Sequence, residues 1–212
     1  MIQIKKFTFN PFQENTYLLF DERGNTLIID PGCMEVFEQQ ELSKFIEENK
    51  LIPKKLLNTH AHIDHILGNN YVMDNYKIDL YLYQSSYDMF QLAKDSAKLY
   101  GIPYDESPEA SHFLKEGDKI ELGEGELEVI FVPGHAPDHL VFLNRKQQWM
   151  IGGDTLFKRS IGRTDLPGGN HDDLIKNIKE KLLVLDEATV VYSGHGPETT
   201  IGEEKKHNPF LV

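Results

Sequence analysis

Seven residues, Thr59-His60-Ala61-His62-Ile63-Asp64-His65, constrain this chain more than any other stretch. They place three imidazoles and a carboxylate directly after the apolar end of a strand predicted at 54–58. His60 and His62 alternate and can aim at one metal ion, while Asp64 and His65 turn toward a second point. Histidine nitrogen and carboxylate oxygen suit zinc, iron or manganese. Because α/β layouts place their sites at the carboxyl ends of strands, the stretch predicts a metal centre on a sheet edge.

Four loops of the chain share one arrangement, in which a predicted strand ends and a histidine or aspartate follows a glycine or turn. The side chains presented in this way are His60, His135, Asp154 and His195. Loops at the ends of packed strands are rigidly supported, as a preorganised site requires. A merely solvated histidine-rich loop explains neither the spacing nor this repetition. Asp30 also ends an apolar run, where it is either an acceptor that orients a metal ligand or a carboxylate in a turn.

Alternation and apolar periodicity predict a chain of mixed strands and helices. Strands are predicted at 2–9, 15–20, 26–30, 54–58, 79–83, 119–122, 126–132, 140–144, 148–151 and 189–192. Helices are predicted at 35–49, 67–75, 84–100 and 172–185, and the apolar face of the first comprises Val36, Leu42, Phe45 and Ile46. The segments 101–118 and 155–170 are expected to be long connections. Since no linker or low-complexity segment interrupts this order, residues 1–212 are expected to form a single domain.

The composition is that of a soluble globular protein, because 40% of the 212 residues are hydrophobic and 26% are charged. The formal net charge of −12 disfavours nucleic acid as a partner, since a phosphate backbone needs clustered lysine and arginine. Cys33 is the only cysteine, so no internal disulfide can form. The sequence shows neither a run of about 18 apolar residues nor a signal-peptide pattern. We therefore expect a cytoplasmic protein that does not span a membrane; the sequence indicates no oligomeric state.

Four motifs together resemble those of the metallo-β-lactamase superfamily, and within it the glyoxalase II group of hydroxyacylglutathione hydrolases. They are the stretch 59–65, Pro133-Gly134-His135, Gly153-Asp154-Thr155-Leu156-Phe157 and Gly194-His195-Gly196, in the family's order and spread over nearly the whole chain. The resemblance implies an α+β fold with α/β-type layers, a four-layer αββα sandwich. The metals would lie along one edge between its two sheets.

The resemblance also implies two divalent metal ions per chain, zinc in the first place and iron or manganese as alternatives. The ligands of the first ion would be His60, His62 and His135, and those of the second Asp64, His65 and His195. Asp154 would bridge both ions, and Asp154 and Asp64 would be the catalytic carboxylates. Asp30 would be the family's aspartate that supports the site without binding metal itself.

Such a centre favours hydrolysis of a thioester. Two ions bridged by Asp154 would lower the pKa of a shared water and give a metal-bound hydroxide that attacks a carbonyl. A thioester fits because its thiolate leaves without a strong general acid. Lys158, Arg159 and Arg163 form a cationic cluster, and Arg163 resembles a substrate-binding lysine of glyoxalase II. Arg163 and Lys158 are therefore expected to bind a small anionic thioester such as an S-hydroxyacylglutathione.

The chain departs from glyoxalase II in two respects. Only residues 197–212 follow the motif Gly194-His195-Gly196, so the helical domain that helps those enzymes hold glutathione is expected to be absent. Asp138 stands where the family often has glycine, and it either faces outward or tunes a ligand. His139 is expected to have a structural role or to orient the loop of His135.

Two alternatives to a hydrolase remain open. An iron-dependent persulfide dioxygenase of the same superfamily is favoured by Gly162-Arg163-Thr164-Asp165, but Ile161 stands where those enzymes usually carry cysteine. One iron per chain would indicate the dioxygenase, and two metals the hydrolase. A non-enzymatic metal-binding module is the other alternative, although structural zinc is normally closed by four ligands, often cysteines. A β-lactamase is disfavoured by the missing export signal, and an RNA-processing nuclease by the acidic charge.

Overall fold

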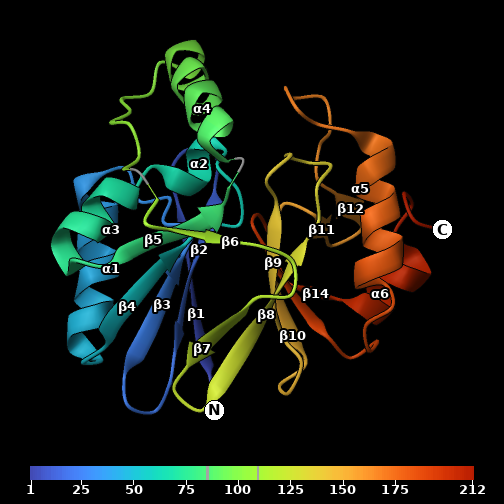
Figure 1. Ribbon diagram of the computed structural model, residues 1–212, viewed down its shortest axis with the longest axis horizontal. Coiled ribbons are helices and arrows are strands. Elements are labelled where there is room, and N and C mark those ends of the chain that lie inside the picture. The colour runs from blue at the N-terminus through green and yellow to red at the C-terminus, as the bar shows by residue number, and fades with distance from the viewer. Residues whose placement is uncertain (85, 109) are drawn as a thin grey trace.

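Two six-stranded sheets organise the computed structural model, which describes residues 1–84, 86–108 and 110–212 (Figure 1). The first sheet has the order β1-β2-β3-β4-β5-β6. Its strands are Gln3–Phe9 (β1), Glu14–Phe20 (β2), Asn25–Ile29 (β3), Ile52–Leu57 (β4), Asp79–Tyr83 (β5) and His112–Leu114 (β6). Strands β3 to β6 pair parallel, so their carboxyl ends meet at one edge.

The second sheet has the order β14-β13-β10-β9-β8-β7. Its strands are Lys119–Leu122 (β7), Gly125–Phe131 (β8), Leu140–Asn144 (β9), Trp149–Gly153 (β10), Val190–Ser193 (β13) and Thr199–Thr200 (β14). β10 runs parallel to β13 and antiparallel to β9, which is itself antiparallel to β8. The loops that follow β8, β10 and β13 therefore also leave from one edge. A separate two-stranded ribbon consists of Leu156–Phe157 (β11) and Ser160–Ile161 (β12).

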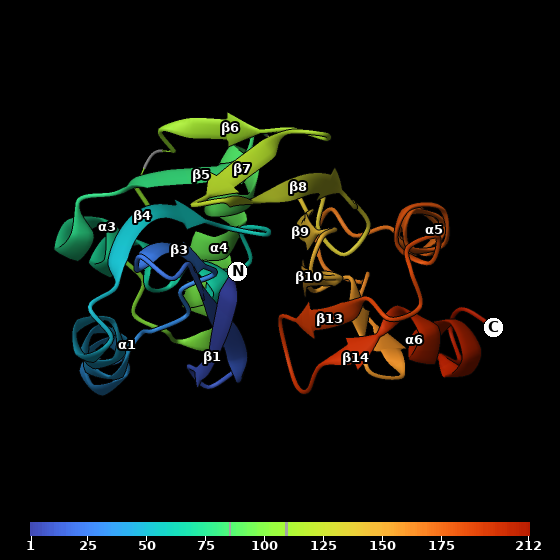
Figure 2. The same cartoon turned by 90° about the horizontal axis from the view of Figure 1, so that it is seen from below.

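Helices cover the outer faces of both sheets. Figure 2 shows α1 and α3 on one flank and α5 and α6 on the other, with the strands between them. The helices are Val36–Glu48 (α1), Ile63–Ile66 (α2), Asn69–Tyr76 (α3), Ser86–Tyr100 (α4), His171–Asn177 (α5) and Ile201–His207 (α6), and a π-helical turn, Ile178–Leu182, continues α5. This order of layers confirms the predicted αββα sandwich. Within the described residues, no helix combines the length and apolarity needed to cross a membrane.

Central strands such as β3, β9 and β10 are buried on both faces because each sheet is packed on both sides. In β3, Leu27 and Ile29 belong to the core between the sheets, while Ile28 belongs to the core under α1. This follows from the alternation of side chains along a strand. Each fully buried leucine or isoleucine stabilises the fold by about 1.5–3 kcal/mol relative to an exposed one. The two sheets thereby form a rigid support for the loops at their common edge.

Helix α4 packs across that edge rather than on an outer face. Met89, Ala93 and Ala97 of α4 are buried against Ala61 and Ile66, which belong to the predicted metal-binding loop and to α2. In Figure 1, α4 stands at the end of the molecule where α2 lies. The helix therefore forms a wall beside the histidine loop.

The structure differs from the sequence prediction mainly in short elements. The sequence does not predict β6, β11, β12, β14 or α6, because two- and three-residue strands and a polar helix leave too little periodicity. The helix expected at 67–75 is preceded by the separate helix α2, and the helix expected at 172–185 becomes π-helical at Ile178 and ends at Leu182. The helix expected at 84–100 begins at Ser86, and residue 85 lies outside the described residues. Val36, assigned to the apolar face of α1, is 66% exposed because it begins the helix, so that assignment is wrong.

Candidate metal centre

The predicted ligands come from loops that follow strands of both sheets. The loop after β4 supplies His60 and His62, the short helix α2 that follows supplies two more, and the loops after β8, β10 and β13 supply one each. Among the described residues, four clusters have one ligand atom per residue within 4.8 Å of the others. Three consist of predicted ligands, His60-His62-His135, Asp64-His65-His195 and His60-His65-Asp154, and the fourth is Glu14-Asp30-His65. The structure thus brings all seven predicted residues together, in the two groups that the family resemblance implies, with Asp154 next to both.

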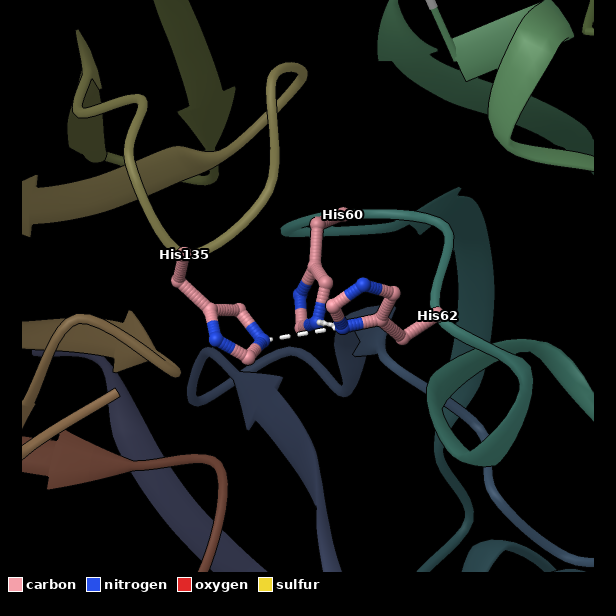
Figure 3. Close-up of side chains that lie close together, drawn as sticks. All are labelled: His60, His62 and His135. Atoms are coloured by element: carbon pink, nitrogen blue, oxygen red, sulfur yellow. Dashed lines mark hydrogen bonds between the residues drawn. The ribbon is translucent and has the colours of Figure 1, made fainter. Parts of the chain in front are cut away.

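Three imidazole nitrogens of the first group converge on one point (Figure 3). His62 Nδ1 lies 3.1 Å from His60 Nε2 and 2.9 Å from His135 Nε2. His60 and His62 approach from the β4 loop and His135 from the β8 loop, so the point lies between the two sheets. Such convergence is the arrangement expected of ligands around one cation.

Hydrogen bonds behind the rings of His60 and His135 decide which nitrogen of each ring faces this point. Thr59 Oγ1 donates to Asp30 Oδ2, and therefore accepts from His60 Nδ1 at 3.0 Å. His135 Nδ1 donates to the carbonyl oxygen of Arg163 at 2.7 Å. Both rings thus carry their proton on Nδ1 and turn the lone pair of Nε2 toward the centre. Acceptors behind ligating histidines have this effect in metal sites generally.

The second group combines a carboxylate with two further imidazoles. Asp64 Oδ2 lies 3.1 Å from His195 Nε2 and 3.7 Å from His65 Nε2. Behind the rings, His65 Nδ1 lies 3.0 Å from Asp30 Oδ2, and His195 Nδ1 lies 3.1 Å from the carbonyl oxygen of Phe12. The Nε2 atoms of both rings therefore face the carboxylates, in the same way as in the first group.

Asp154 lies between the two groups. Its Oδ1 is 3.5 Å from His65 Nε2, while its Oδ2 is 3.5 Å from both His135 Nε2 and His195 Nε2. Gly194 permits this position, since a Cβ there would approach Asp154 Oδ1 to 2.1 Å. One carboxylate can therefore offer an oxygen to each group.

Burial and mutual charge shift the pKa values of the two groups in opposite directions. Burial and neighbouring imidazoles lower the pKa of His60 well below its usual value and that of His62 to about 3. Burial acts against the ionised forms of His65 and Asp154 as well. Here the opposite charges outweigh it, so the pKa of His65 is raised and that of Asp154 is lowered far below its ordinary value. The first group is accordingly neutral, and Asp154 is anionic.

Two unpartnered atoms test whether these residues fit a metal. His65 Nε2 and Asp154 Oδ1 are buried and have no hydrogen-bond partner. Leaving buried polar atoms unpaired costs free energy, and such atoms in native proteins call for an explanation. Both atoms face the space between the groups, where a cation would coordinate them. The donor set of nitrogen and oxygen fits zinc or iron.

Asp30 directly follows β3 beneath the site and supports two ligands. Its Oδ1 accepts from the backbone N–H of Thr59 at 2.7 Å, and its Oδ2 accepts from Thr59 Oγ1 at 2.6 Å and from His65 Nδ1. Through Thr59 it also reaches His60. Its φ of +48° is unusual for a residue with a side chain, which is a strain that the hydrogen bonds help to offset. These contacts favour the acceptor role over the simple turn.

Glu14 is a further buried carboxylate at the site that the sequence reading does not identify. It begins β2, is fully buried, and its Oε1 lies 3.9 Å from His65 Nδ1. Glu14 Oε2 accepts from Thr16 Oγ1 at 2.9 Å, and burial raises the pKa of the carboxyl well above its usual value. The cost of burying a charge, which singles out Asp30 in the sequence, is the signal that could also have found Glu14.

His139 contacts Asp154 through the backbone. His139 Nε2 accepts the N–H of Asp154 at 2.9 Å, and the His139 ring stacks on that of His60 at 4.7 Å between ring centroids. Gly153 is required beside it, since its φ is +50° and a Cβ would lie 2.6 Å from His139 Nε2. The structure therefore agrees with a structural or orienting role for His139.

A pocket of about 420 Å³ opens over both groups. Its apolar lining comes from several elements: Phe12, Ile63, Tyr100, Phe157, Ile161 and Leu166. Arg163 also lines the pocket and forms a bidentate pair with Asp165, with both N–O distances at 2.8 Å. A larger groove of about 860 Å³ lies beside Met1 and the β7–β8 turn, and its lining includes none of the predicted site residues. Figure 1 shows the N-terminus at the end of the molecule away from α4.

The predicted cationic cluster does not act as a unit. Arg159 pairs with Glu203 at 2.7 Å, on the side of α6. Lys158 is exposed and is not part of the pocket lining, whereas Arg163 is. Of the three cations, the structure therefore places one where a substrate at the metal groups could reach it.

Comparison with known proteins identifies the family. The model of the metallo-beta-lactamase superfamily matches residues 9–195. This chain belongs to the metallo-β-lactamase superfamily. It is 38% identical over 209 residues to the probable metallo-hydrolase YqgX of Bacillus subtilis, covering 98% of this chain and 96% of that protein. It is 36% identical over 202 residues to the hydroxyacylglutathione hydrolase GloC of Haemophilus influenzae, covering 94% and 93%.

Solved structures of this superfamily have the same fold. The B3 metallo-beta-lactamase BLEG-1 superposes with a TM-score of 0.91 at 36% identity, covering 99% of this chain and all 100% of that one. TTHA1623, solved in a di-iron-bound form, superposes with a TM-score of 0.88 at 34% identity, covering 98% and 100%. The chain is accordingly a member of a superfamily of metallo-hydrolases, and its His/Asp clusters fit a metal site.

Proposed function

We propose that this chain is a dinuclear metal-dependent hydrolase of small anionic thioesters in the cytoplasm. The observation that carries the proposal is the position of Asp154 between two complete groups of ligand atoms, beneath a pocket. Structural metal sites are closed by protein ligands, whereas catalytic sites keep positions open to substrate. The relative named hydroxyacylglutathione hydrolase adds support for a thioester, because its substrate class is of this kind.

The residues around the pocket would have distinct roles. One ion would be held by His60, His62 and His135, and the other by Asp64, His65 and His195, with Asp154 available to both. When bound, the ions supply Lewis acidity toward the carbonyl and lower the pKa of water. Zinc is the first candidate, and the di-iron form of TTHA1623 makes iron a second. The thiolate of a thioester leaves without protonation, so the site needs no separate general acid.

Arg163 and the apolar wall would orient the substrate. The guanidinium can exchange its pair with Asp165 for a substrate carboxylate, because both bind in the same bidentate geometry. The apolar side chains of Phe12, Tyr100 and Phe157 would contact the uncharged part of the substrate and exclude water from it. A single arginine suits a thioester with one carboxylate near the metals.

Metal analysis of the purified protein, together with a substrate panel, tests the proposal. The panel contains S-lactoylglutathione, thioesters of smaller thiols, a lactone, a β-lactam and glutathione persulfide. We expect about two ions per chain and fastest turnover of a thioester. A protein with two ions that hydrolyses no thioester, or that prefers the β-lactam, would contradict the proposed substrate class.

The same experiment decides the iron-dependent persulfide dioxygenase. The segment Gly162-Arg163-Thr164-Asp165 favours that function, and the structure places Arg163 and its partner Asp165 beside His135. Ile161 lines the pocket at the position where those enzymes usually have cysteine. One iron per chain, with oxygen consumption on glutathione persulfide, would establish the dioxygenase and exclude the hydrolase.

A further inference from the structure

Asp138 is buried inside the protein, although it stands where the resembled family often has glycine. Its side chain is 0% exposed, which excludes the first of the two alternatives that the sequence leaves open, an outward-facing carboxylate. It lies three residues after His135, in the same loop after β8. A buried carboxylate is costly unless hydrogen bonds compensate it, so its partners indicate why the position is occupied by a charge-bearing residue.

One oxygen of Asp138 contacts two elements that are distant in the sequence. Oδ2 accepts a hydrogen bond from the backbone N–H of Ala61 at 3.1 Å and another from the hydroxyl of Ser86 at 2.6 Å. Ala61 lies between His60 and His62, and Ser86 is the first residue of α4. The carboxylate therefore links three segments: the β4 loop, the β8 loop and the helix that packs over them.

The bond to Ala61 restrains two ligands at once. His60 and His62 are joined through the peptide units of Ala61, and their ring nitrogens are 3.1 Å apart. Rotation of these peptides would move both rings, and it would also break the hydrogen bond to Asp138. Functional side chains must be held within roughly 0.5 Å of their productive positions, which requires such support from neighbouring groups.

The bond to Ser86 anchors α4 at its first residue. Farther along the helix, Ser96 and Tyr100 line the pocket. Between these points α4 packs on the histidine loop through Met89, Ala93 and Ala97, two of which are alanines that bury little area. The hydrogen bond between Ser86 and Asp138 thus connects α4, which lines the pocket, to the loop after β8.

We propose that Asp138 is a positioning residue that couples the loop of His60 and His62 to helix α4 through one carboxylate oxygen. The proposal rests on the assignment of His60 and His62 as ligands, and so on the proposed function. Its test uses metal binding and hydrogen exchange, which do not require hydrolysis of any substrate. Failure to hydrolyse thioesters would therefore leave the coupling testable on its own.

The experiment titrates Co²⁺ into the metal-free protein and follows the visible d–d absorption for the first equivalent. Asp138→Ala should weaken binding of this ion about 10- to 100-fold and change the spectrum, the range typical of residues that orient ligands. Asp138→Asn should bind within about threefold of wild type, because asparagine keeps one acceptor oxygen for Ala61 and Ser86. Ser86→Ala should leave cobalt binding within about twofold and increase hydrogen exchange of α4 amides.

Glu204→Ala is the matched control for loss of a buried carboxylate. Glu204 is also 0% exposed, but it accepts from the backbone N–H of Arg159 and from Asn208 Nδ2 on the α6 flank. Glu204→Ala should lower the free energy of unfolding without changing the cobalt spectrum or the hydrogen exchange of the α4 amides. Asp138→Gly, which restores the residue common in the family, replaces Asp138→Ala if the alanine variant does not fold.

Three results would overturn the coupling. Removal of the Asp138 side chain could leave cobalt affinity and α4 exchange at wild-type values. Asparagine could be as damaging as alanine, which would exclude the acceptor oxygen as the cause. Ser86→Ala could weaken cobalt binding as much as Asp138→Ala, which would show that α4 holds the loop without the direct bond to Ala61. If the wild type binds no cobalt, the ligand assignment and the coupling both fail.

Discussion

Asp30→Asn should impair binding of the second metal ion while the fold is retained. Asparagine has the shape of aspartate but replaces one acceptor oxygen by an NH2 donor. If this NH2 faces His65 Nδ1, 3.0 Å away in the wild type, the His65 proton must move to Nε2, the atom that faces Asp64 and Asp154. The same NH2 then donates to Thr59 Oγ1, whose hydroxyl can no longer donate to residue 30. If the amide is turned over, its NH2 faces the backbone N–H of Thr59. In the wild type this N–H donates to Asp30 Oδ1 at 2.7 Å, so in the variant two donors would face each other. The metal-free protein can adopt the first arrangement, but a protein with metal on His65 Nε2 cannot.

The size of the effect follows from this mismatch. Metal binding forces one buried donor to remain unpaired, which costs about 1–3 kcal/mol. At 1.4 kcal/mol for each factor of ten, the affinity for the second ion falls roughly 5- to 150-fold. At a metal concentration that just saturates the wild type, we expect about one ion per chain in the variant.

Equilibrium dialysis with metal analysis measures the second affinity, and ¹⁵N NMR of the histidine side chains in the metal-free protein reports the tautomer of His65. Asp21→Asn is the matched control, because Asp21 is also buried and hydrogen-bonded but lies in the turn between β2 and β3. A variant of Asp30 that binds two ions with wild-type affinity would refute the tautomer argument.

Three further predictions concern other carboxylates and the pocket arginine. Asp154→Asn should bind about one ion per chain and hydrolyse thioesters orders of magnitude more slowly, because a neutral amide cannot offer an anionic oxygen to each group. Metal analysis that finds two tightly bound ions would contradict the shared role. Arg163→Ala should raise KM for an anionic thioester about two- to fivefold and leave kcat nearly constant. This is expected of an exposed ion pair that forms equally in the ground and transition states. An unchanged KM would exclude a contact between Arg163 and the substrate. Burial raises the pKa of Asp138 from 3.8 to about 6, so the stability gained from its protonated form is complete below pH 3.8 and is lost as the pH rises to about 6. Metal-free Asp138→Asn cannot ionise. Chemical unfolding should therefore show its free energy of unfolding rising by about 2–3 kcal/mol relative to wild type between pH 4 and 7. A constant difference would show that the carboxyl does not titrate in this range.

The main strands and helices could be predicted because their residues are apolar with a clear period. The strand at 26–30 and the helix at 35–49 agree with β3 and α1 within one or two residues. Elements such as β14 and α6 could not be predicted, since Thr199–Thr200 is too short for a period and α6 is mostly charged. These elements owe their structure to neighbours, as when Thr200 accepts from the backbone N–H of Glu203 to begin α6.

The predicted ligand residues do lie together, but the contacts around them were only partly predictable. For Asp138 the sequence leaves open whether the side chain faces outward, and Glu14 was not identified, because the residues next to them in the sequence do not show which distant segments cover them. Their burial follows from the approach of α4 to one and of His65 to the other. Lys158, like Arg163, was expected to bind substrate, but Lys158 is exposed and outside the pocket lining. The β11–β12 turn carries its neighbour Arg159 toward α6.

The sequence by itself determined which chemical groups are available and at which strand ends they are presented. Parallel strands align their carboxyl ends, so His60, Asp154 and His195 had to reach the edges of their sheets. Only the tertiary structure decided which nitrogen of each histidine faces the centre. That choice depends on acceptors from distant segments, such as the carbonyl oxygens of Arg163 and Phe12, and these come within hydrogen-bond distance only when the two sheets pack together.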